Sequence, residues 1–188
     1  RPVALVVEEV SMSEPDYLAE IREQRAFMMQ HVPHSAAIGM TFVDVEPNAA
    51  ILMVPYAEKL VGNPDTGVIH GGVITSLLDN ASGIAVHCHM GERKGMATLD
   101  LRIDYMRPAT PGEDVYGRAE CYKVTNNVAF VRGTAYHLNN GQHRLDDPIA
   151  TCVASFMITG GPIADWKDMA AQAAGGQLPA DQAESGER

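Results

Sequence analysis

The spacing of apolar residues along this chain changes after about the first forty residues. Near the N-terminus, apolar positions recur at the spacing that places them on one face of a helix: Leu18, Ile21, Met28, Met29 and Val32. Ser13, with Asp16 three positions later, is typical of a capping box at a helix start. The pattern predicts an amphipathic helix of about four turns that ends before Pro33 and covers part of the core.

Later segments show the period of two that is typical of strands. Residues 40–56 hold two β-type runs on either side of Glu46, Pro47 and Asn48, and this turn chemistry predicts a hairpin. Residues 97–108 alternate strictly, so we expect Leu99, Leu101, Ile103 and Tyr105 on one face and Asp100, Arg102 and Asp104 on the other. Further strands are predicted at 115–124, 128–139 and 149–158, with polar loops at 62–67 and 139–148.

Between these strands lies a segment that is helical in length and apolar on almost every side. It runs from Gly71 to about Met90, and Gly91 suits the end of a helix. A helix without a polar face is normally buried, and short connections between strands imply antiparallel pairing. We therefore predict an α+β fold in which a curved antiparallel β-sheet wraps around one long central helix, preceded by an N-terminal helix.

The same pattern divides the chain into three parts. We expect an N-terminal helical extension at residues 1–36, one sheet-and-helix domain at 37–160, and a C-terminal segment at 161–188. In that last segment, residues 163–174 are predicted to form a short helix and the remainder a disordered tail. A length of 188 residues suits one domain with flanking pieces.

Composition and charge exclude several classes of partner. The formal net charge of −10 argues against binding to nucleic acid or to an anionic membrane surface. No apolar run approaches the roughly 18 residues that span a bilayer. The three cysteines are widely spaced, which fits reduced thiols in a cytosol better than a disulfide framework. We therefore expect a cytoplasmic protein that binds neither nucleic acid nor membranes.

A carboxylate, Asp79, interrupts the apolar central helix. Burying an acid without partners costs several kcal/mol, so its ordinary explanation is a structural group that accepts hydrogen bonds from nearby Ser, Thr or backbone N–H groups. The start of the helix, His70-Gly71-Gly72, favours a chemical role instead. Free N–H groups and the positive end of the helix dipole there can stabilise an oxyanion, and glycine lets a carbonyl approach closely.

Two further features point the same way. Thr75, Ser76 and Asp79 are three and four residues apart, so one stripe of the helix is polar, and Thr98 on the returning strand could add a hydroxyl. Gly71 and Asp79, however, are about 12 Å apart along a helix axis, so one chain cannot place both on one carbonyl carbon. If Asp79 is catalytic, two antiparallel copies of the helix must form an obligate dimer with two sites at its interface.

Other candidate groups receive simpler interpretations. Consecutive side chains on a helix project in different directions, so His87, Cys88 and His89 are not expected to bind one metal ion. Favourable interaction with the dipole at the helix C-terminus explains these histidines. His31 and His34 flank Pro33 and are interpreted as loop residues. We expect neither a metal nor a nucleophilic cysteine.

The segments HGGVITSLLDNASG, ATLDLRIDYMRPATPGEDV and NNVAFVRGTAY together resemble the hotdog-fold acyl-CoA thioesterases of the PaaI-like group, over residues 37–160. The resemblance implies a hotdog fold and hydrolysis of an acyl-CoA to free acid and coenzyme A. It implies no cofactor, because coenzyme A is part of the substrate. It also implies a homodimer, often paired into a tetramer.

Roles for individual residues follow from the same resemblance. The Gly71 N–H would polarise the thioester carbonyl, and His70 would support the loop. Asp79 of the partner subunit would activate water or attack as a nucleophile, and Thr98 would orient that water. Similar proteins place an Asn or Gln upstream of the HGG; here the loop is one residue longer, so Asn63 is either that residue or a turn residue before Pro64.

Coenzyme A contacts are assigned to Gly72, Arg107 and Lys123. The resemblance places Arg107 in the segment of the nucleotide site, and Lys123 and Arg132 are further cations that could hold phosphates. Two other functions stay open: a non-catalytic acyl-CoA binding protein, and a hotdog hydratase or dehydratase acting on a 3-hydroxyacyl thioester. The His and acid arrangement usual for the latter chemistry is not found here.

Overall fold

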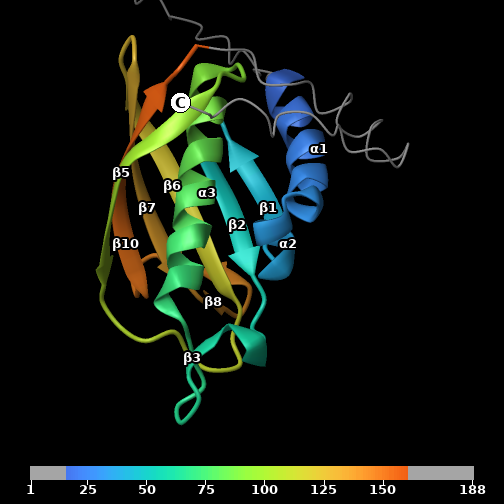
Figure 1. Cartoon of the computed structure of the whole chain (residues 1–188), viewed down its shortest axis with the longest axis vertical. Coiled ribbons are helices and arrows are strands. Elements are labelled where there is room, and N and C mark those ends of the chain that lie inside the picture. Colours follow the sequence, from blue (N-terminus) through green and yellow to red (C-terminus); the bar gives the residue numbers. More distant parts are fainter. Residues whose placement is uncertain (1–15, 161–188) are drawn as a thin grey trace, which may run out of the picture.

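A long apolar helix lies in the hollow of a six-stranded antiparallel sheet (Figure 1). The computed structural model describes residues 16–160. Its elements in chain order are α1 (Asp16–His31), α2 (Pro33–Ala37), β1 (Thr41–Glu46), β2 (Ala49–Val54), a 3-10 turn (Glu58–Leu60), β3 (Val61–Asn63), β4 (Val68–Ile69), α3 (Gly71–Met90), β5 (Met96–Tyr105), β6 (Val115–Val124), β7 (Val128–Tyr136), β8 (Leu138–Asn139), β9 (Gln142–His143) and β10 (Ala150–Ile158). The predicted α+β architecture is confirmed.

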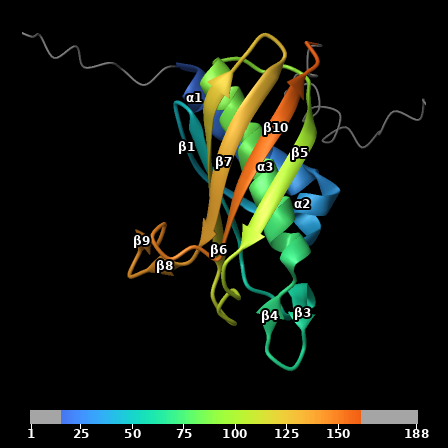
Figure 2. The ribbon, with the colours of Figure 1, turned by 90° about the vertical axis from the view of Figure 1, so that its left-hand side faces the viewer.

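The central helix α3 has the predicted ends. His70 is its N-cap, and Gly91 closes it in the left-handed conformation with φ 67°, which glycine adopts without strain. Apolar side chains of α3, including Leu77 and Leu78, are fully buried against β2, β6 and β7. The sheet order is β1-β2-β6-β7-β10-β5, so β5 is an edge strand, and Figure 2 shows it beside β10.

A β-bulge in β5 corrects one prediction from the sequence. Asp100 pairs with Ser155 and Thr98 pairs with Phe156, so Leu99 is an extra residue without a partner. Beyond the bulge the alternation changes phase, and Thr98 shares the inner face with Phe156, Leu101 and Tyr105. The prediction that Leu99 lies on the same face as Leu101 is therefore wrong, and Leu99 is 53% exposed.

Three loops predicted from the sequence contain regular structure. His31 is the last residue of α1 and Pro33 begins the short helix α2, so His31 and His34 are both helical and not loop residues. Nε2 of His34 lies 3.0 Å from Ser76 Oγ of α3. The polar stretch at 62–67 is the tip of the β3–β4 hairpin, and the loop at 139–148 contains the β8–β9 hairpin. These elements are two to five residues long, too short to leave a periodic pattern.

The N-terminal helix α1 packs its apolar stripe inward, as predicted. Leu18, Ile21 and Met29 are buried, and α1 lies against β1. The capping box at Ser13 and the helix and tail predicted after residue 160 lie outside the described residues. Among the helices of residues 16–160, none is both long and apolar enough to cross a membrane.

A buried polar pair joins α1 to the C-terminal turn of α3. The Arg25 guanidinium donates to Nδ1 of His87, and Nε2 of His87 donates to the Lys94 carbonyl at 3.1 Å. Burial, followed by the charge of Arg25, lowers the pKa of His87 to about 4. His87 is therefore neutral at pH 7, and the prediction that a favourable interaction with the helix dipole explains it is wrong for this residue.

The free energy of unfolding is expected to fall as the pH drops from 6.5 to about 4, because the unfolded chain protonates His87 in that window and the folded chain does not. The loss due to His87 is expected to reach about 3 kcal/mol. Urea unfolding of the wild type and of His87→Gln, which cannot titrate, measures it. Equal pH slopes for the two proteins would contradict the assignment.

Candidate active site

The first turn of α3 offers one unbonded amide. His70 Nδ1 accepts a hydrogen bond from the Gly72 N–H at 2.9 Å, and the His70 carbonyl accepts one from the Val73 N–H at 3.0 Å. Among the described residues, no acceptor is found for the Gly71 N–H. His70 is thus the N-cap: its side chain accepts the hydrogen bond of the Gly72 N–H, and the Gly71 N–H stays without an acceptor in the described part of the chain.

Both glycines of the HGG turn stand where a side chain has little room. A Cβ at Gly72 would lie 2.9 Å from His70 Nδ1, so the cap requires glycine there. A Cβ at Gly71 would lie 3.1 Å from Tyr105 Oη. The Gly72 N–H is already bonded to His70 Nδ1. A direct contact between Gly72 and coenzyme A stays a prediction.

The middle of α3 holds the candidate acid. Asp79 is half-buried, and its Oδ1 accepts a hydrogen bond from Thr98 Oγ1 at 3.0 Å. The bulge at Leu99 turns Thr98 toward the helix, so the hydroxyl expected near Asp79 is present. Strict alternation along β5 would have turned Thr98 to the opposite face. No donor to Asp79 Oδ2 is found in the described part of the chain, so this oxygen is available to a water or a substrate.

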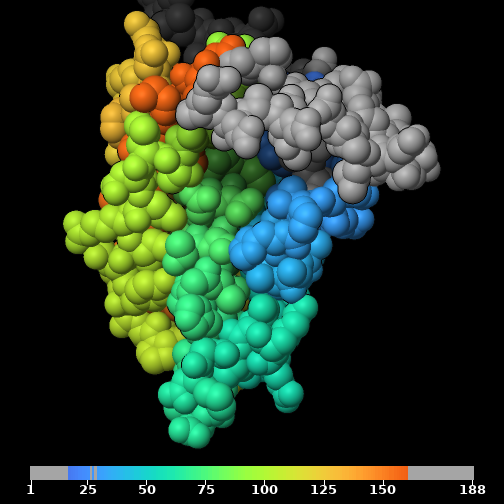
Figure 3. Space-filling model, in the orientation of Figure 1, coloured from blue at the N-terminus to red at the C-terminus, as the bar shows by residue number. Residues whose placement is uncertain are grey.

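The two halves of the site do not meet within one chain. Gly71 begins α3 and Asp79 lies eight residues later in the same straight helix, about 12 Å away along the axis. This face of the helix reaches the surface between β5 and α2 (Figure 3). Thr75, Ser76, Asp79 and Asn80 are half-buried there, so the polar stripe expected from the sequence borders solvent.

Tyr105 has no role in the interpretation of the sequence. Its Oη donates to the Gly71 carbonyl at 2.8 Å and lies 3.1 Å from Thr75 Oγ1. The alternation of β5 correctly placed Tyr105 on the same face as Leu101 and Ile103, but only the packing of β5 against α3 reveals its partner. Tyr105 also lines an open pocket of about 450 Å³ beside the helix start, together with Gly71, Met106 and Arg107.

Asn63 occupies the β3–β4 hairpin that projects beyond the start of α3 (Figure 1). Its Oδ1 accepts a hydrogen bond from the Asp65 N–H at 3.0 Å, which is the turn role foreseen as the alternative. The hairpin lies at the Gly71 end of the helix, so Asn63 could meet only the Asp79 of another subunit. Its catalytic role stays a prediction.

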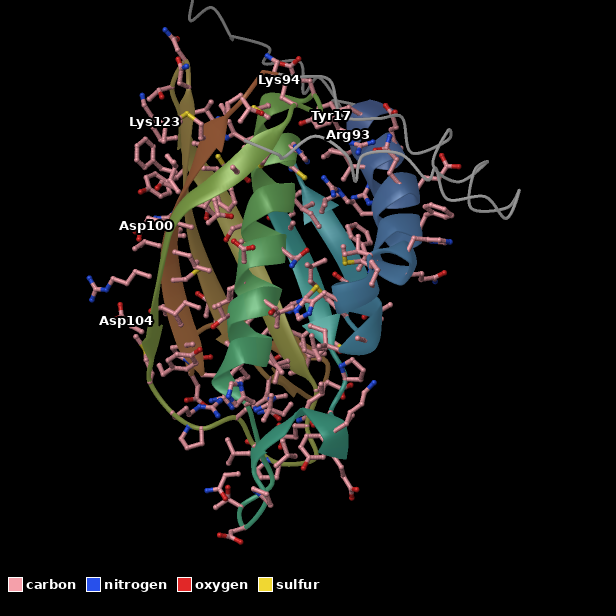
Figure 4. All side chains as sticks on the ribbon, viewed as in Figure 1. Tyr17, Arg93, Lys94, Asp100, Asp104 and Lys123 are labelled. Carbon is pink, nitrogen blue, oxygen red and sulfur yellow. The ribbon has the colours of Figure 1, made fainter. Side chains whose placement is uncertain are left out.

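The candidate cations are separated. Arg107 follows β5 at the Gly71 end and binds Asp147 through Nε to Oδ1 and through Nη2 to the carbonyl, both at 3.0 Å. Lys123 lies at the opposite end of the sheet, where α3 finishes (Figure 4). Arg132 pairs with Glu120 at 3.1 Å. One chain therefore does not bring Arg107 and Lys123 to the same phosphate.

Neither a metal centre nor a reactive thiol emerges from residues 16–160. No group of three His, Cys, Asp or Glu side chains there could hold a metal ion. Burial raises the pKa of Cys88 to about 12 and that of Cys121 to about 11, and it also raises the pKa of Cys152. These thiols are protonated at neutral pH and are poor nucleophiles.

Comparisons with known proteins give the family of this chain and its relatives in fold. Residues 66–142 match the model of the thioesterase superfamily. The chain is 31% identical over 141 residues to the medium/long-chain acyl-CoA thioesterase YigI of Escherichia coli K12, covering 68% of this chain and 86% of that protein. A solved structure from Pseudomonas aeruginosa is 43% identical with a TM-score of 0.62, covering 73% of this chain and 98% of that one. The E. coli PaaI protein shares the fold at 18% identity, with a TM-score of 0.64 over 78% of this chain and 99% of that one.

Proposed function

Since this chain belongs to the thioesterase superfamily and is a thioester hydrolase, we propose that it hydrolyses an acyl-CoA to a free acid and coenzyme A. The resemblance to PaaI-like proteins and the hotdog fold predicted from the sequence are confirmed. The observation that carries the proposal is a divided site on one helix: the unbonded amide of Gly71 and the carboxylate of Asp79 held by Thr98. The proposed chemistry uses no cofactor.

The active unit is a homodimer with two sites at its interface. No strand of the described residues pairs with the outer edge of β5, and Tyr105 and Leu99 on this strand are about half exposed. An unpaired strand edge is a template for another strand. Two β5 edges joined about a two-fold axis perpendicular to the sheet would bring the α3 helices antiparallel, with Gly71 of each near Asp79 of the other.

In each site, the Gly71 N–H polarises the thioester carbonyl and stabilises the tetrahedral oxyanion. Asp79 Oδ2 takes a proton from a water whose oxygen bonds to the carbonyl carbon. Collapse of the intermediate breaks the C–S bond, and the proton passes to the departing sulfur, which yields the acid and free coenzyme A. Direct attack by Oδ2, followed by hydrolysis of the anhydride, uses the same two groups.

Thr98 orients the carboxylate of Asp79 in this scheme, so Thr98→Val is expected to lower kcat about tenfold and to leave KM nearly unchanged. Loss of the hydroxyl leaves both oxygens of Asp79 free to rotate away from the water. Thr98→Ser keeps the donor and is the control, with kcat expected within about threefold of wild type. Steady-state kinetics on both variants measure the effect; equal losses in the two would remove Thr98 from the scheme.

Arg107 is proposed to hold a phosphate of coenzyme A, since it lines the pocket beside Gly71 and its side chain is only about a quarter exposed. A phosphate there would compete with Asp147 for the guanidinium. The contact of Lys123 with coenzyme A and the pairing of dimers into a tetramer stay predictions. A cytoplasmic location, which the buried free thiols would suit, is also a prediction.

A thiol-release assay over acyl-CoAs of short, medium, long and aryl chains tests the proposed function. The E. coli relative is named for medium- and long-chain substrates, so we expect octanoyl-CoA and longer chains to be hydrolysed fastest. Absence of thiol release across the whole panel, with the protein folded and dimeric, would overturn the proposal.

A further inference from the structure

Among the described residues, one hydrogen bond from the sheet reaches the glycines at the start of α3. Three of the side-chain contacts to Gly71 and Gly72 come from α3 or its cap: Thr75 Oγ1 lies 3.2 Å from the Gly71 carbonyl oxygen, Ser76 Oγ donates to the Gly72 carbonyl, and the Gly72 N–H donates to His70 Nδ1. The fourth, from Tyr105 Oη to the Gly71 carbonyl at 2.8 Å, comes from β5, 34 residues away. The first three move with the helix, whereas the fourth fixes it.

Such a tether matters because the first turn of a helix frays and glycine adds backbone freedom. An oxyanion donor is effective only when it is fixed before the reaction. A misplacement of about 1 Å can cost a factor of roughly 100 in rate. The Gly71 N–H therefore needs a restraint on each side: the His70 N–H, which donates to the Leu60 carbonyl at 2.8 Å, holds the residue before it, and Tyr105 holds the Gly71 carbonyl that follows it.

Counting hydrogens shows how the tether is built. The Gly71 carbonyl, Thr75 Oγ1 and Tyr105 Oη lie within 2.8, 3.1 and 3.2 Å of one another, but the two hydroxyls carry only one hydrogen each. The shortest contact takes the Tyr105 hydrogen, and Thr75 then donates to Tyr105 Oη. When the Tyr105 hydroxyl is removed, Thr75 can donate to the carbonyl instead, so no polar group loses its only partner.

We propose that Tyr105 is a positioning residue that fixes the Gly71 amide for oxyanion stabilisation, and this inference rests on the proposed thioesterase function. Tyr105 acts through Gly71 and touches no reacting atom. The hydrogen count separates its role from a structural one: Tyr105→Phe keeps the ring that packs over Gly71, keeps the carbonyl bonded through Thr75, and loses only the link to β5.

Kinetics on octanoyl-CoA provide the first test. For Tyr105→Phe we expect kcat to fall about tenfold, KM to stay within about twofold, and the melting temperature to stay within a few degrees of wild type. Tyr122→Phe is the matched control, because Tyr122 is equally exposed but lies on β6. Its kcat is expected to equal that of wild type. Unchanged kcat in Tyr105→Phe would overturn the inference.

Infrared spectroscopy provides the second test and does not depend on turnover. Octanoyl-CoA labelled with ¹³C at the carbonyl is bound to Asp79→Asn, with and without Tyr105→Phe. We expect the carbonyl band of the ligand bound to Asp79→Asn to lie at a lower frequency than that of free octanoyl-CoA. In the double variant we expect this shift to be at most half as large. Identical bands would overturn the positioning role even if stability had fallen. If the wild type hydrolyses acyl-CoA and Tyr105→Phe has the same kcat, this inference alone is overturned. If the wild type does not hydrolyse acyl-CoA, the proposed function is overturned as well.

Discussion

Asp79→Asn is expected to lower kcat/KM for acyl-CoA hydrolysis by at least about 100-fold while the protein stays folded and dimeric. Asparagine has nearly the same shape and can still accept the Thr98 hydroxyl through its side-chain oxygen. It cannot take a proton from water or attack a carbonyl. Thiol release and thermal unfolding, measured on the same preparation, separate lost chemistry from lost stability.

Asp100→Asn is the control for that substitution. Asp100 lies on the face of β5 turned away from α3 (Figure 4) and undergoes the same change of charge and shape. Its kcat/KM is expected to stay within about twofold of wild type. If Asp79→Asn retained similar activity, the carboxylate would be a structural group and the proposed mechanism would be wrong.

Gly71→Pro is expected to lower kcat by about 100- to 1000-fold, because proline removes the N–H that stabilises the oxyanion. The substitution suits the backbone: Gly71 is the first residue of α3, where proline is favoured, and His70 has the extended ψ of 134° that precedes proline. Stopped-flow or steady-state thiol release measures the loss, and circular dichroism verifies the helix.

Gly71→Ala separates the amide from the space around it. Alanine introduces the same Cβ at 3.1 Å from Tyr105 Oη but keeps the N–H. We expect a loss of less than about tenfold, from a small shift of the tyrosine. Equal losses in the alanine and proline variants would mean that crowding, and not the missing donor, had reduced the rate.

The sequence predicts the fold well where patterns are long. The apolar run of α3, its end at Gly91 and the hairpin of β1 and β2 are local features, and all were predicted. The bulge at Leu99 was not, because an inserted residue leaves the apolar alternation intact and is visible only in the pairing of β5 with β10. The neutral state of His87 likewise depends on Arg25, which the fold brings from another helix.

The candidate site shows the same division. His70, Gly71 and Asp79 belong to one helix, so their spacing follows directly from the sequence. Thr98 could be proposed from the strand that comes after that helix. Tyr105 could not be given a role, because its partner is 34 residues away and is a backbone carbonyl with no side chain to suggest it. The positions of the cations were the least predictable. Arg107 and Lys123 are both cations on or next to a strand, but they lie at opposite ends of the sheet.

The most direct test of the central claim is subunit complementation between Asp79→Asn and Gly71→Pro. The two variants, each nearly inactive alone, are co-expressed with different affinity tags, and the mixed dimer is purified. If each site combines the Gly71 amide of one protomer with Asp79 of the other, one site of the mixed dimer is intact, and its activity should reach about half that of wild type. Activity no higher than that of the separate variants would show that the two groups do not act across an interface, and would contradict the account.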